Sequence, residues 1–258
     1  MAAAHPPDGR VLVLDFDGVI AQSAPEALLV ARRTHERLFP DLPLPCSEEA
    51  LAREFVRLMP FGNRAEDYGA ALRAIALGVP IEDQATYDAF KAGLPEETLQ
   101  AFHRRFYEER RRLEQEDRGR WLALLRPYPE VVDLLRRRGS ERILAIATAK
   151  DRHSVGRLLD HYGIAELFPA DLRLDKETGV TKDLHLRHLA DRLRIPFEAM
   201  TFVDDKVHHL DCVAPLGVRC VLAGWGYNTS REAELARAHG HEVATLEDVE
   251  PRLFGSPG

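Results

Sequence analysis

Short apolar runs alternate with helical patterns along most of the chain. The first run covers residues 11–14, and others follow at 143–147, weakly at 170–174, at 200–203 and at 218–222. A continuous run of Val, Ile and Leu is typical of a strand that is covered on both faces of a parallel sheet, although a buried helix segment can share this pattern. The alternation therefore predicts an α/β fold, a doubly wound parallel sheet with helices on both faces.

Between residues 21 and 127 strand patterns stop, and one helix start follows another. Ser47 precedes one apolar stripe, Asn63 with Glu66 has the spacing of a capping box before a second, and Pro95 begins a third helix. We therefore predict two domains. Residues 1–20 and 128–258 form the α/β core, and residues 21–127 form an all-helical domain inserted between the first two strands of the sheet.

The composition and charge of the chain exclude several classes of protein. With 258 residues and 45% hydrophobic content, the chain can bury a core without disulfides or structural metals. A net charge of −7 argues against a nucleic-acid partner. The three cysteines have no paired spacing, and we recognise neither a signal peptide nor a membrane-spanning segment. We expect a cytoplasmic protein without a membrane partner, and the sequence leaves its oligomeric state open.

Each main predicted strand ends in a particular kind of polar residue. Asp15 and Asp17 follow the first strand, Thr148 follows the second, and Asp204 with Asp205 follows the run at 200–203. Carboxylates do not belong inside a buried sheet, and open α/β sheets hold their ligands at the carboxyl ends of the strands. We expect these five side chains to meet at one edge.

A lysine can reach the same edge. Lys182 opens the helix before the 200–203 strand, with Thr181 as its expected N-cap, whereas the competing Lys176 lies in a turn-like segment. Ser23 and Glu26 have the spacing of a capping box for the first helix, which leaves the preceding aspartates available for chemistry.

Converging carboxylates raise one another's pKa unless a cation lies among them. Ligation by oxygen alone suits Mg²⁺, a hard ion that often bridges a protein to phosphate. Such an ion also lets an anionic nucleophile approach an anionic phosphoryl group. The pattern therefore favours phosphoryl chemistry at a magnesium site.

The set of motifs resembles the haloacid dehalogenase superfamily. That pattern is hydrophobic-Asp-x-Asp-Gly-Val, hydrophobic-Thr or Ser, Lys, and hydrophobic-Asp-Asp, and here it occupies residues 14–19, 147–148, 182 and 202–205. The helical insertion after the first motif is similar to the cap domain of that family. The resemblance implies a Mg²⁺-dependent phosphatase that acts on a small phosphorylated metabolite.

The resemblance also implies a role for each motif residue. Asp15 would attack phosphorus to form an aspartyl-phosphate, and Asp17 would act as acid and then as base. Thr148 would hold a phosphoryl oxygen, and Lys182 would neutralise the transferred charge. The residues that would hold magnesium are Asp15, Asp17 through its carbonyl, Asp204 and Asp205. Which of the tandem acids binds directly stays open.

Other functions compete with this interpretation. A phosphomutase would use the same residues, and a phosphonate hydrolase would need a cap lysine, for which Lys91 is the candidate. A haloacid dehalogenase would not need Asp17, and a non-catalytic binding protein has no evident need for both aspartates of the first motif. No histidine pair has metal-ligand spacing, so we do not predict a histidine metal site.

Two residues of the insertion are candidates for substrate contact. Asn63 and Arg64 follow a Pro-Phe-Gly segment at a loop-to-helix junction, where an arginine could bind a substrate anion. An exposed residue at a helix start is an equally good explanation.

Overall fold

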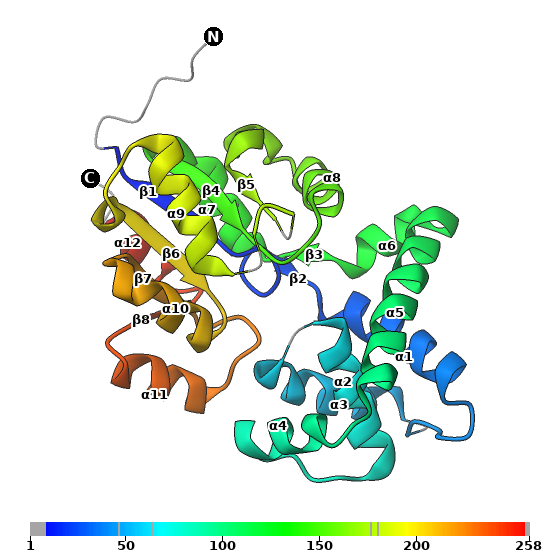
Figure 1. Cartoon of the computed structure of the whole chain (residues 1–258). Helices are drawn as coiled ribbons and strands as arrows, with labels where there is room; N and C mark the ends of the chain where they lie inside the picture. The colour runs from blue at the N-terminus through cyan, green and yellow to red at the C-terminus, as the bar shows by residue number, and fades with distance from the viewer. Residues whose placement is uncertain (1–8, 46, 63, 176, 180, 256–258) are drawn as a thin grey trace. The chain divides into compact units, whose positions relative to one another are not determined.

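The computed structural model describes residues 9–45, 47–62, 64–175, 177–179 and 181–255. It divides into two compact units (Figure 1). One is an α/β unit, Met1–Gln22 with Arg126–Gly258, and the other is a helical unit, Ser23–Leu125.

The α/β unit is built on a six-stranded sheet of order β5-β4-β1-β6-β7-β8, in which every neighbouring pair is parallel. The strands are β1 (Val11–Leu14), β4 (Ile143–Ala147), β5 (Arg173–Leu174), β6 (Met200–Asp204), β7 (Arg219–Ala223) and β8 (Glu242–Ala244). This sheet confirms the predicted fold class. The weak run at 170–174 is mostly a 3₁₀ turn, Ala170–Leu172, and only its last two residues form β5. Strand β8 has no counterpart among the predicted strands.

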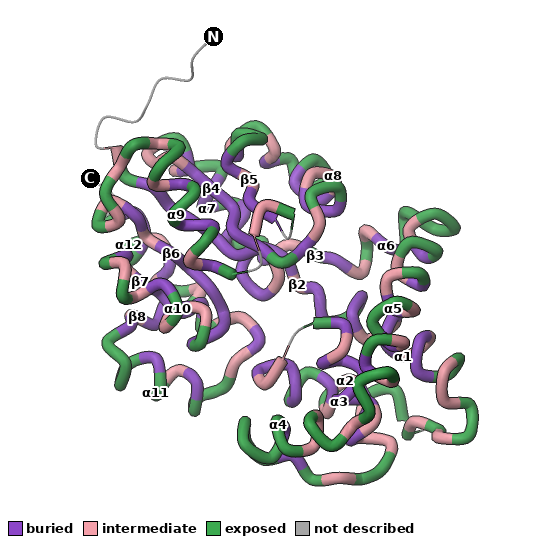
Figure 2. The backbone as a smooth tube through the Cα atoms, in the orientation of Figure 1, coloured by how far each residue is buried: buried purple, intermediate pink, exposed green. Residues whose placement is uncertain are grey.

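Both faces of the sheet are buried. Val11 and Val13 of β1 pack in a cluster with residues of α9, α10 and α11, while the alternate residues Leu12 and Leu14 are equally buried on the opposite face. In Figure 2 the buried colour accordingly runs along the strands. The helices of this unit are α7 (Pro129–Arg138), α8 (Arg152–Tyr162), α9 (Lys182–Leu193), α10 (Val207–Val213), α11 (Ser230–Ala238) and α12 (Val249–Phe254).

A short antiparallel pair lies where the chain leaves and re-enters the α/β unit. Strand β2 (Ala21–Gln22) pairs with β3 (Arg126–Pro127). The sequence pattern did not predict this pair, because two residues are too few to show a strand periodicity.

The helical unit contains α1 (Ala24–Leu38), α2 (Glu48–Leu58), α3 (Ala65–Leu77), α4 (Gln84–Ala92), α5 (Glu96–Glu116) and α6 (Arg118–Leu124). A row of aromatic rings joins three of these helices: Phe55 contacts Tyr68, and Tyr68 contacts Phe106, at centroid distances of 5.4 and 5.6 Å. A Cβ at Gly69 would lie 2.7 Å from the Phe102 ring, so α3 and α5 approach closely only because this residue is glycine. None of the described helices contains a segment long and apolar enough to cross a bilayer.

The helix starts of this unit confirm one predicted cap and correct another. Ser47 does cap α2, accepting a hydrogen bond from the Ala50 amide. At α1, however, the structure shows no side-chain capping bond from Ser23, and Glu26 is fully buried against Arg110. That capping-box prediction is wrong because an ion pair with a distant helix takes the carboxylate.

The Glu26–Arg110 pair tests how much the helical unit depends on one buried charge. Arg110 donates two hydrogen bonds of 2.7 Å to Glu26, whose side chain is 0% exposed. Arg110→Met would leave the carboxylate buried without its partner, and we expect a loss of about 3 to 5 kcal/mol in the free energy of unfolding.

Urea unfolding followed by Trp121 fluorescence in a Trp225→Phe background measures this, because Trp121 lies in the helical unit. The matched control is Arg32→Met, since Arg32 pairs with Glu36 at the surface with 38% exposure, and it should cost less than about 1 kcal/mol. Equal losses in the two variants would contradict the assignment.

Candidate active site

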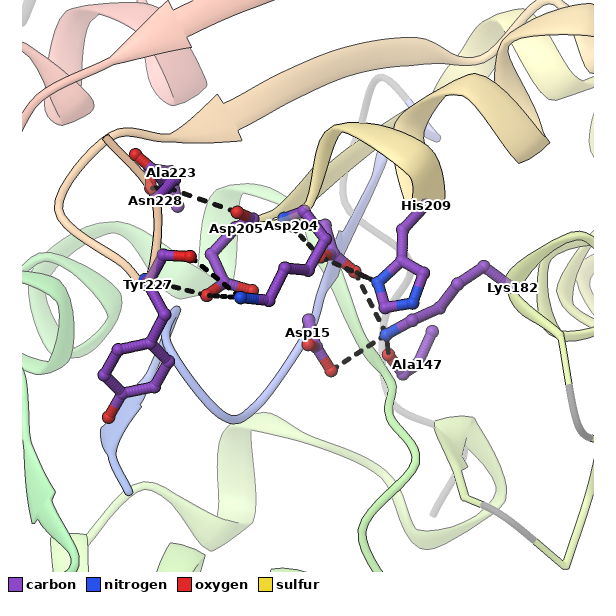
Figure 3. A network of polar contacts seen from close by, with 10 residues as sticks. Asp15, Ala147, Lys182, Asp204, Asp205, His209, Ala223, Tyr227 and Asn228 are labelled. Atoms are coloured by element: carbon purple, nitrogen blue, oxygen red, sulfur yellow. Dashed lines mark hydrogen bonds and ion pairs between the residues drawn. The ribbon is translucent and has the colours of Figure 1, made fainter. Parts of the chain in front are cut away.

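The ends of β1 and β6 bring the acidic motifs together. The Asp15 amide, one residue beyond β1, donates to the Val203 carbonyl of β6 at 2.9 Å, and Asp204 ends β6. Figure 3 shows Asp15, Asp204 and Asp205 gathered where these strands end, as the sequence predicts. All three side chains are buried.

Lys182, the first residue of α9, lies among these acids (Figure 3). Its Nζ is 2.9 Å from Asp15 Oδ1 and 3.1 Å from Asp204 Oδ2, and it donates to the Ala147 carbonyl at 2.6 Å. Burial opposes the charged form, but the two carboxylates outweigh it and raise the pKa of the lysine. Thr181 holds the predicted N-cap position without a side-chain capping bond in the described residues. Lys176, the competing candidate, lies outside the described residues.

Both carboxylate oxygens of Asp204 face hydrogen-bond donors. Its Oδ1 accepts from the Lys206 amide at 2.9 Å, and His209 Nδ1 lies 3.0 Å from both carboxylate oxygens. Burial favours the neutral acid, but His209 and Lys182 prevail and keep the pKa of Asp204 below its usual value. This carboxylate therefore stays ionised and orients the groups around it.

Asp205 has a different environment. Its Oδ2 accepts from the Tyr227 amide at 2.8 Å, and Lys206 Nζ is 3.7 Å from the same oxygen. Its Oδ1 is buried and has no hydrogen-bond partner in the described structure. Burial, followed by repulsion from Asp204 and Asp15, raises the pKa of Asp205 to about 7, against the opposing charge of Lys206.

Two glycines make room for Asp205. Gly18 has a φ of +84°, and a Cβ there would lie 2.3 Å from Asp205 Oδ2. A Cβ at Gly226 would lie 2.3 Å from Asp205 Cβ and 2.6 Å from the Gly18 carbonyl oxygen. The Asp205 side chain thus occupies a space that a side chain at position 18 or 226 would fill.

The donor set fits a hard divalent cation. Asp205 Oδ1 is buried without a hydrogen-bond partner in the described residues, whereas Asp15 Oδ1 lies 2.9 Å from the Lys182 ammonium. Burial also raises the pKa of Asp15. The buried Asp205 oxygen therefore lacks a partner that a cation would supply. Asp15, Asp204 and His209 also offer ligand atoms that lie within 4.8 Å of one another.

His209 was not predicted as part of this site. It lies near the start of α10, five residues after Asp204, and the pair His208-His209 after the tandem acids matches no ligand motif. Only the turn from β6 into α10 shows that it faces the carboxylate.

The second motif contributes a lysine that sequence reasoning missed. Lys150 is buried, and its Nζ lies 2.9 and 3.1 Å from the carboxylate oxygens of Asp17, whose side chain is 26% exposed. Thr148 is buried at the end of β4, where its hydroxyl accepts from the Lys150 amide at 3.2 Å. The signal that could have predicted it was the position of this lysine, two residues after Thr148 at the end of the second strand.

Arg64, one of the two predicted substrate contacts, lies in the helical unit. Arg64 is the exposed N-cap residue of α3, and its amide donates to Asp67 Oδ2 at 3.0 Å. This bond corrects the predicted cap, because Asp67 takes the part expected of Glu66. Asn63 lies outside the described residues. Asp67 also pairs with Lys91.

Comparison with known proteins identifies the class to which this fold and site belong. The model of the haloacid dehalogenase-like hydrolase family matches residues 10–211, and the chain belongs to this family.

Solved structures share the fold along almost the whole chain. A predicted phosphoglycolate phosphatase from Haemophilus somnus 129PT aligns with a TM-score of 0.63 at 20% identity, over 94% of this chain and 96% of that one. A haloacid dehalogenase-like family protein from Streptococcus pneumoniae aligns with a TM-score of 0.68 at 13% identity, over 96% and 99%. At these identities the likeness concerns the fold alone.

One curated relative shares a shorter segment. The tyrosine-protein kinase PtkA of Mycobacterium tuberculosis is 36% identical over 86 residues, which is 33% of this chain and 29% of the kinase. The chain therefore matches less than a third of that relative's length.

The environment of Asp205 predicts a pH dependence of stability in the metal-free protein. Its pKa is about 7 in the folded state against an ordinary value of 3.8, so the folded state binds more protons between these values. The contribution of Asp205 to the free energy of unfolding should therefore fall as pH rises through this window.

Urea unfolding in EDTA at a series of pH values, with the wild type compared with Asp205→Asn, isolates this contribution. The stability of the wild type relative to the variant should decrease steadily from pH 4 to pH 8. The control Asp133→Asn, an exposed position in α7, should show no such trend. If the difference in unfolding free energy between the wild type and Asp205→Asn stays constant with pH, the raised pKa of the buried Asp205 carboxyl is contradicted.

Proposed function

We propose that this chain is a cytoplasmic, Mg²⁺-dependent phosphomonoester hydrolase that acts on a small phosphorylated metabolite through an aspartyl-phosphate on Asp15. The main support is the buried Asp205 oxygen, which has no hydrogen-bond partner in the described residues, together with the buried Asp15 carboxylate paired with Lys182. Family membership and the phosphatase named among the structural neighbours agree with this reaction class.

The proposed magnesium site follows from the donor set. Asp15, Asp205 and the Asp17 carbonyl would hold the ion directly. Asp204, already bonded to His209 and Lys182, would orient the site from behind. Bound Mg²⁺ would neutralise phosphoryl charge and orient the substrate.

In the first step, an oxygen of Asp15 attacks phosphorus, and the bond to the leaving oxygen breaks. Asp17 donates a proton to that oxygen, so the alcohol leaves neutral. For this, Asp17 must first lose its ion pair with Lys150. A substrate phosphate would compete for the same ammonium and leave Asp17 free to carry the proton.

In the second step, Asp17 takes a proton from water, and the resulting hydroxide attacks the phosphorus of the aspartyl-phosphate. The bond between phosphorus and the Asp15 oxygen breaks, which restores the carboxylate and releases phosphate. The Thr148 hydroxyl and the Lys150 and Lys182 ammonium groups would stabilise the phosphoryl oxygens in both steps.

Phosphoryl transfer to a protein hydroxyl is the second candidate, because the partial match to a tyrosine-protein kinase favours it. It would use the same aspartate with another acceptor in place of water. A phosphonate hydrolase is disfavoured, because Lys91 is paired with Asp67 and would have to become a neutral amine to attack a carbonyl.

The decisive experiment measures phosphate release from p-nitrophenyl phosphate with and without Mg²⁺. We expect metal-dependent turnover in the wild type, the uncatalysed rate in Asp15→Asn, and full activity in the surface control Asp133→Asn. No turnover in the wild type, or equal turnover in Asp15→Asn, would overturn the proposal. ATP-dependent labelling of a tyrosine peptide without phosphate release would favour the second candidate.

Asp17→Asn should separate the two chemical steps. We expect kcat to fall by about 10² to 10⁴-fold for an alkyl phosphate, whose leaving oxygen needs the proton. With p-nitrophenyl phosphate the first step should be less impaired, because nitrophenolate leaves without protonation. Rapid-quench kinetics should then show a nitrophenolate burst followed by slow phosphate release. Equal losses for both substrates in the first step would contradict the acid role of Asp17.

Arg64 offers a test of substrate recognition by the helical unit. Arg64→Ala should raise KM for substrates with a second anionic group by more than it does for p-nitrophenyl phosphate, because a guanidinium would bind that group. Arg53→Ala, at another exposed position in this unit, is the matched control. If the ratio of kcat/KM for the doubly anionic substrates to kcat/KM for p-nitrophenyl phosphate is the same in Arg64→Ala and the wild type, Arg64 does not contact substrate.

A further inference from the structure

A second group of metal-ligand side chains lies in the α/β unit. Asp211 belongs to α10, His239 follows α11, and His241 immediately precedes β8 (Figure 1, orange to red segments). Asp211 Oδ1 lies 2.9 Å from His239 Nδ1 and 2.8 Å from His241 Nε2. Both histidines fall beyond residue 211, where the family match ends, and the proposed mechanism uses none of the three residues.

The backbone fixes the two histidines in place. Gly240 has a φ of +84°, its amide donates to the Arg237 carbonyl at 3.0 Å, and the His241 amide donates to the Ala236 carbonyl at 2.8 Å. These bonds close the C-terminus of α11 around a left-handed glycine. His239 and His241 are therefore two residues apart on a constrained turn, with both rings directed at one carboxylate oxygen.

The spacing of the ligand atoms suits a transition-metal ion. The three atoms lie within 4.8 Å of one another, and ligands about 2.1 Å from a common ion are roughly 3.0 to 3.4 Å apart. The ion would replace the two protons that the rings now share with Asp211. Two imidazole nitrogens and a carboxylate oxygen suit Zn²⁺ or Co²⁺ better than Mg²⁺.

Burial and charge are favourable for such an ion. The His241 side chain is 4% exposed, whereas Asp211 and His239 are 40% and 41% exposed. One ligand is thus anchored in the protein, and the open side leaves room for water to complete the coordination. The C-terminal end of α11 carries partial negative charge, which also favours a cation.

We propose that Asp211, His239 and His241 form a second metal site that binds Zn²⁺ or a similar divalent ion with water as the remaining ligand. The site is separate from the acidic site around Asp15 in both its residues and its chemistry. A bound ion would link α10 to the turn between α11 and β8, and so stabilise this corner of the α/β unit.

Zn²⁺ binding to the EDTA-stripped, full-length protein in saturating Mg²⁺ tests the proposal by isothermal titration. Wild type should bind Zn²⁺ at this site, and His239→Ala and Asp211→Ala should each weaken that binding by more than about tenfold. His188→Ala, which changes an exposed histidine of α9, should not. His209→Ala removes a possible Zn²⁺ ligand at the acidic site, so it distinguishes the two sites. It should leave Zn²⁺ binding at the second site unchanged.

Two further measurements complete the test. Co²⁺ should give visible absorption bands in the wild type that both cluster variants lose, and Zn²⁺ should raise the melting temperature of the wild type but not of His239→Ala. Zn²⁺ affinity and stoichiometry that are identical in the wild type and both cluster variants would overturn the proposal. So would a wild type that binds no Zn²⁺ in saturating Mg²⁺, because then Asp211 only accepts hydrogen bonds from the two rings.

Discussion

The arrangement at the carboxyl edge of the sheet depends on the ion pairs of Lys182. Parallel pairing of β1 with β6 forces Asp15 and Asp204 into neighbouring buried positions, where two carboxylates would repel one another and lack solvation. A single ammonium contacts both acids, and its third bond goes to the Ala147 carbonyl at the end of β4. Lys182 thereby joins the ends of three adjacent strands. Its position as the first residue of α9 makes the start of that helix part of the site rather than a peripheral connection.

The tandem acids show how identical residues acquire different properties. Asp204 points toward three donors and stays ionised, whereas Asp205 keeps an oxygen without a partner and holds its proton more tightly. The difference comes from the alternation of side chains at a strand end, which directs neighbouring residues to opposite sides. One acid then meets α9 and α10, while the other meets the loops at Gly18 and Gly226. Asp205 therefore keeps one oxygen without a hydrogen bond in the described residues, whereas both Asp204 oxygens are held by neighbouring donors.

The sequence was sufficient for features that depend on strong local patterns. The runs that became β1, β4, β6 and β7 are long and apolar, and Asp15 and Asp204 lie side by side because β1 and β6 pair in parallel. The two-residue strands β2, β3 and β5 are too short for such a pattern. Partners from distant elements were equally inaccessible: Glu26 fits a capping box by spacing, yet Arg110, 84 residues away, binds it. Lys150 and His209 were missed because their roles depend on where a turn directs a side chain, which spacing does not encode.

The part of the chain beyond the family match completes the site. Residue 211 ends that match, but the Tyr227 amide and the Asn228 side chain bind Asp205 from the loop after β7. Gly226 provides the space in which that carboxylate lies. Strand β7 pairs with β6 from Thr201 to Asp204, so the same pairing that extends the sheet also brings this loop to Asp205. The environment that distinguishes the tandem acids is therefore a product of the whole α/β unit, and motif residues alone would not create it.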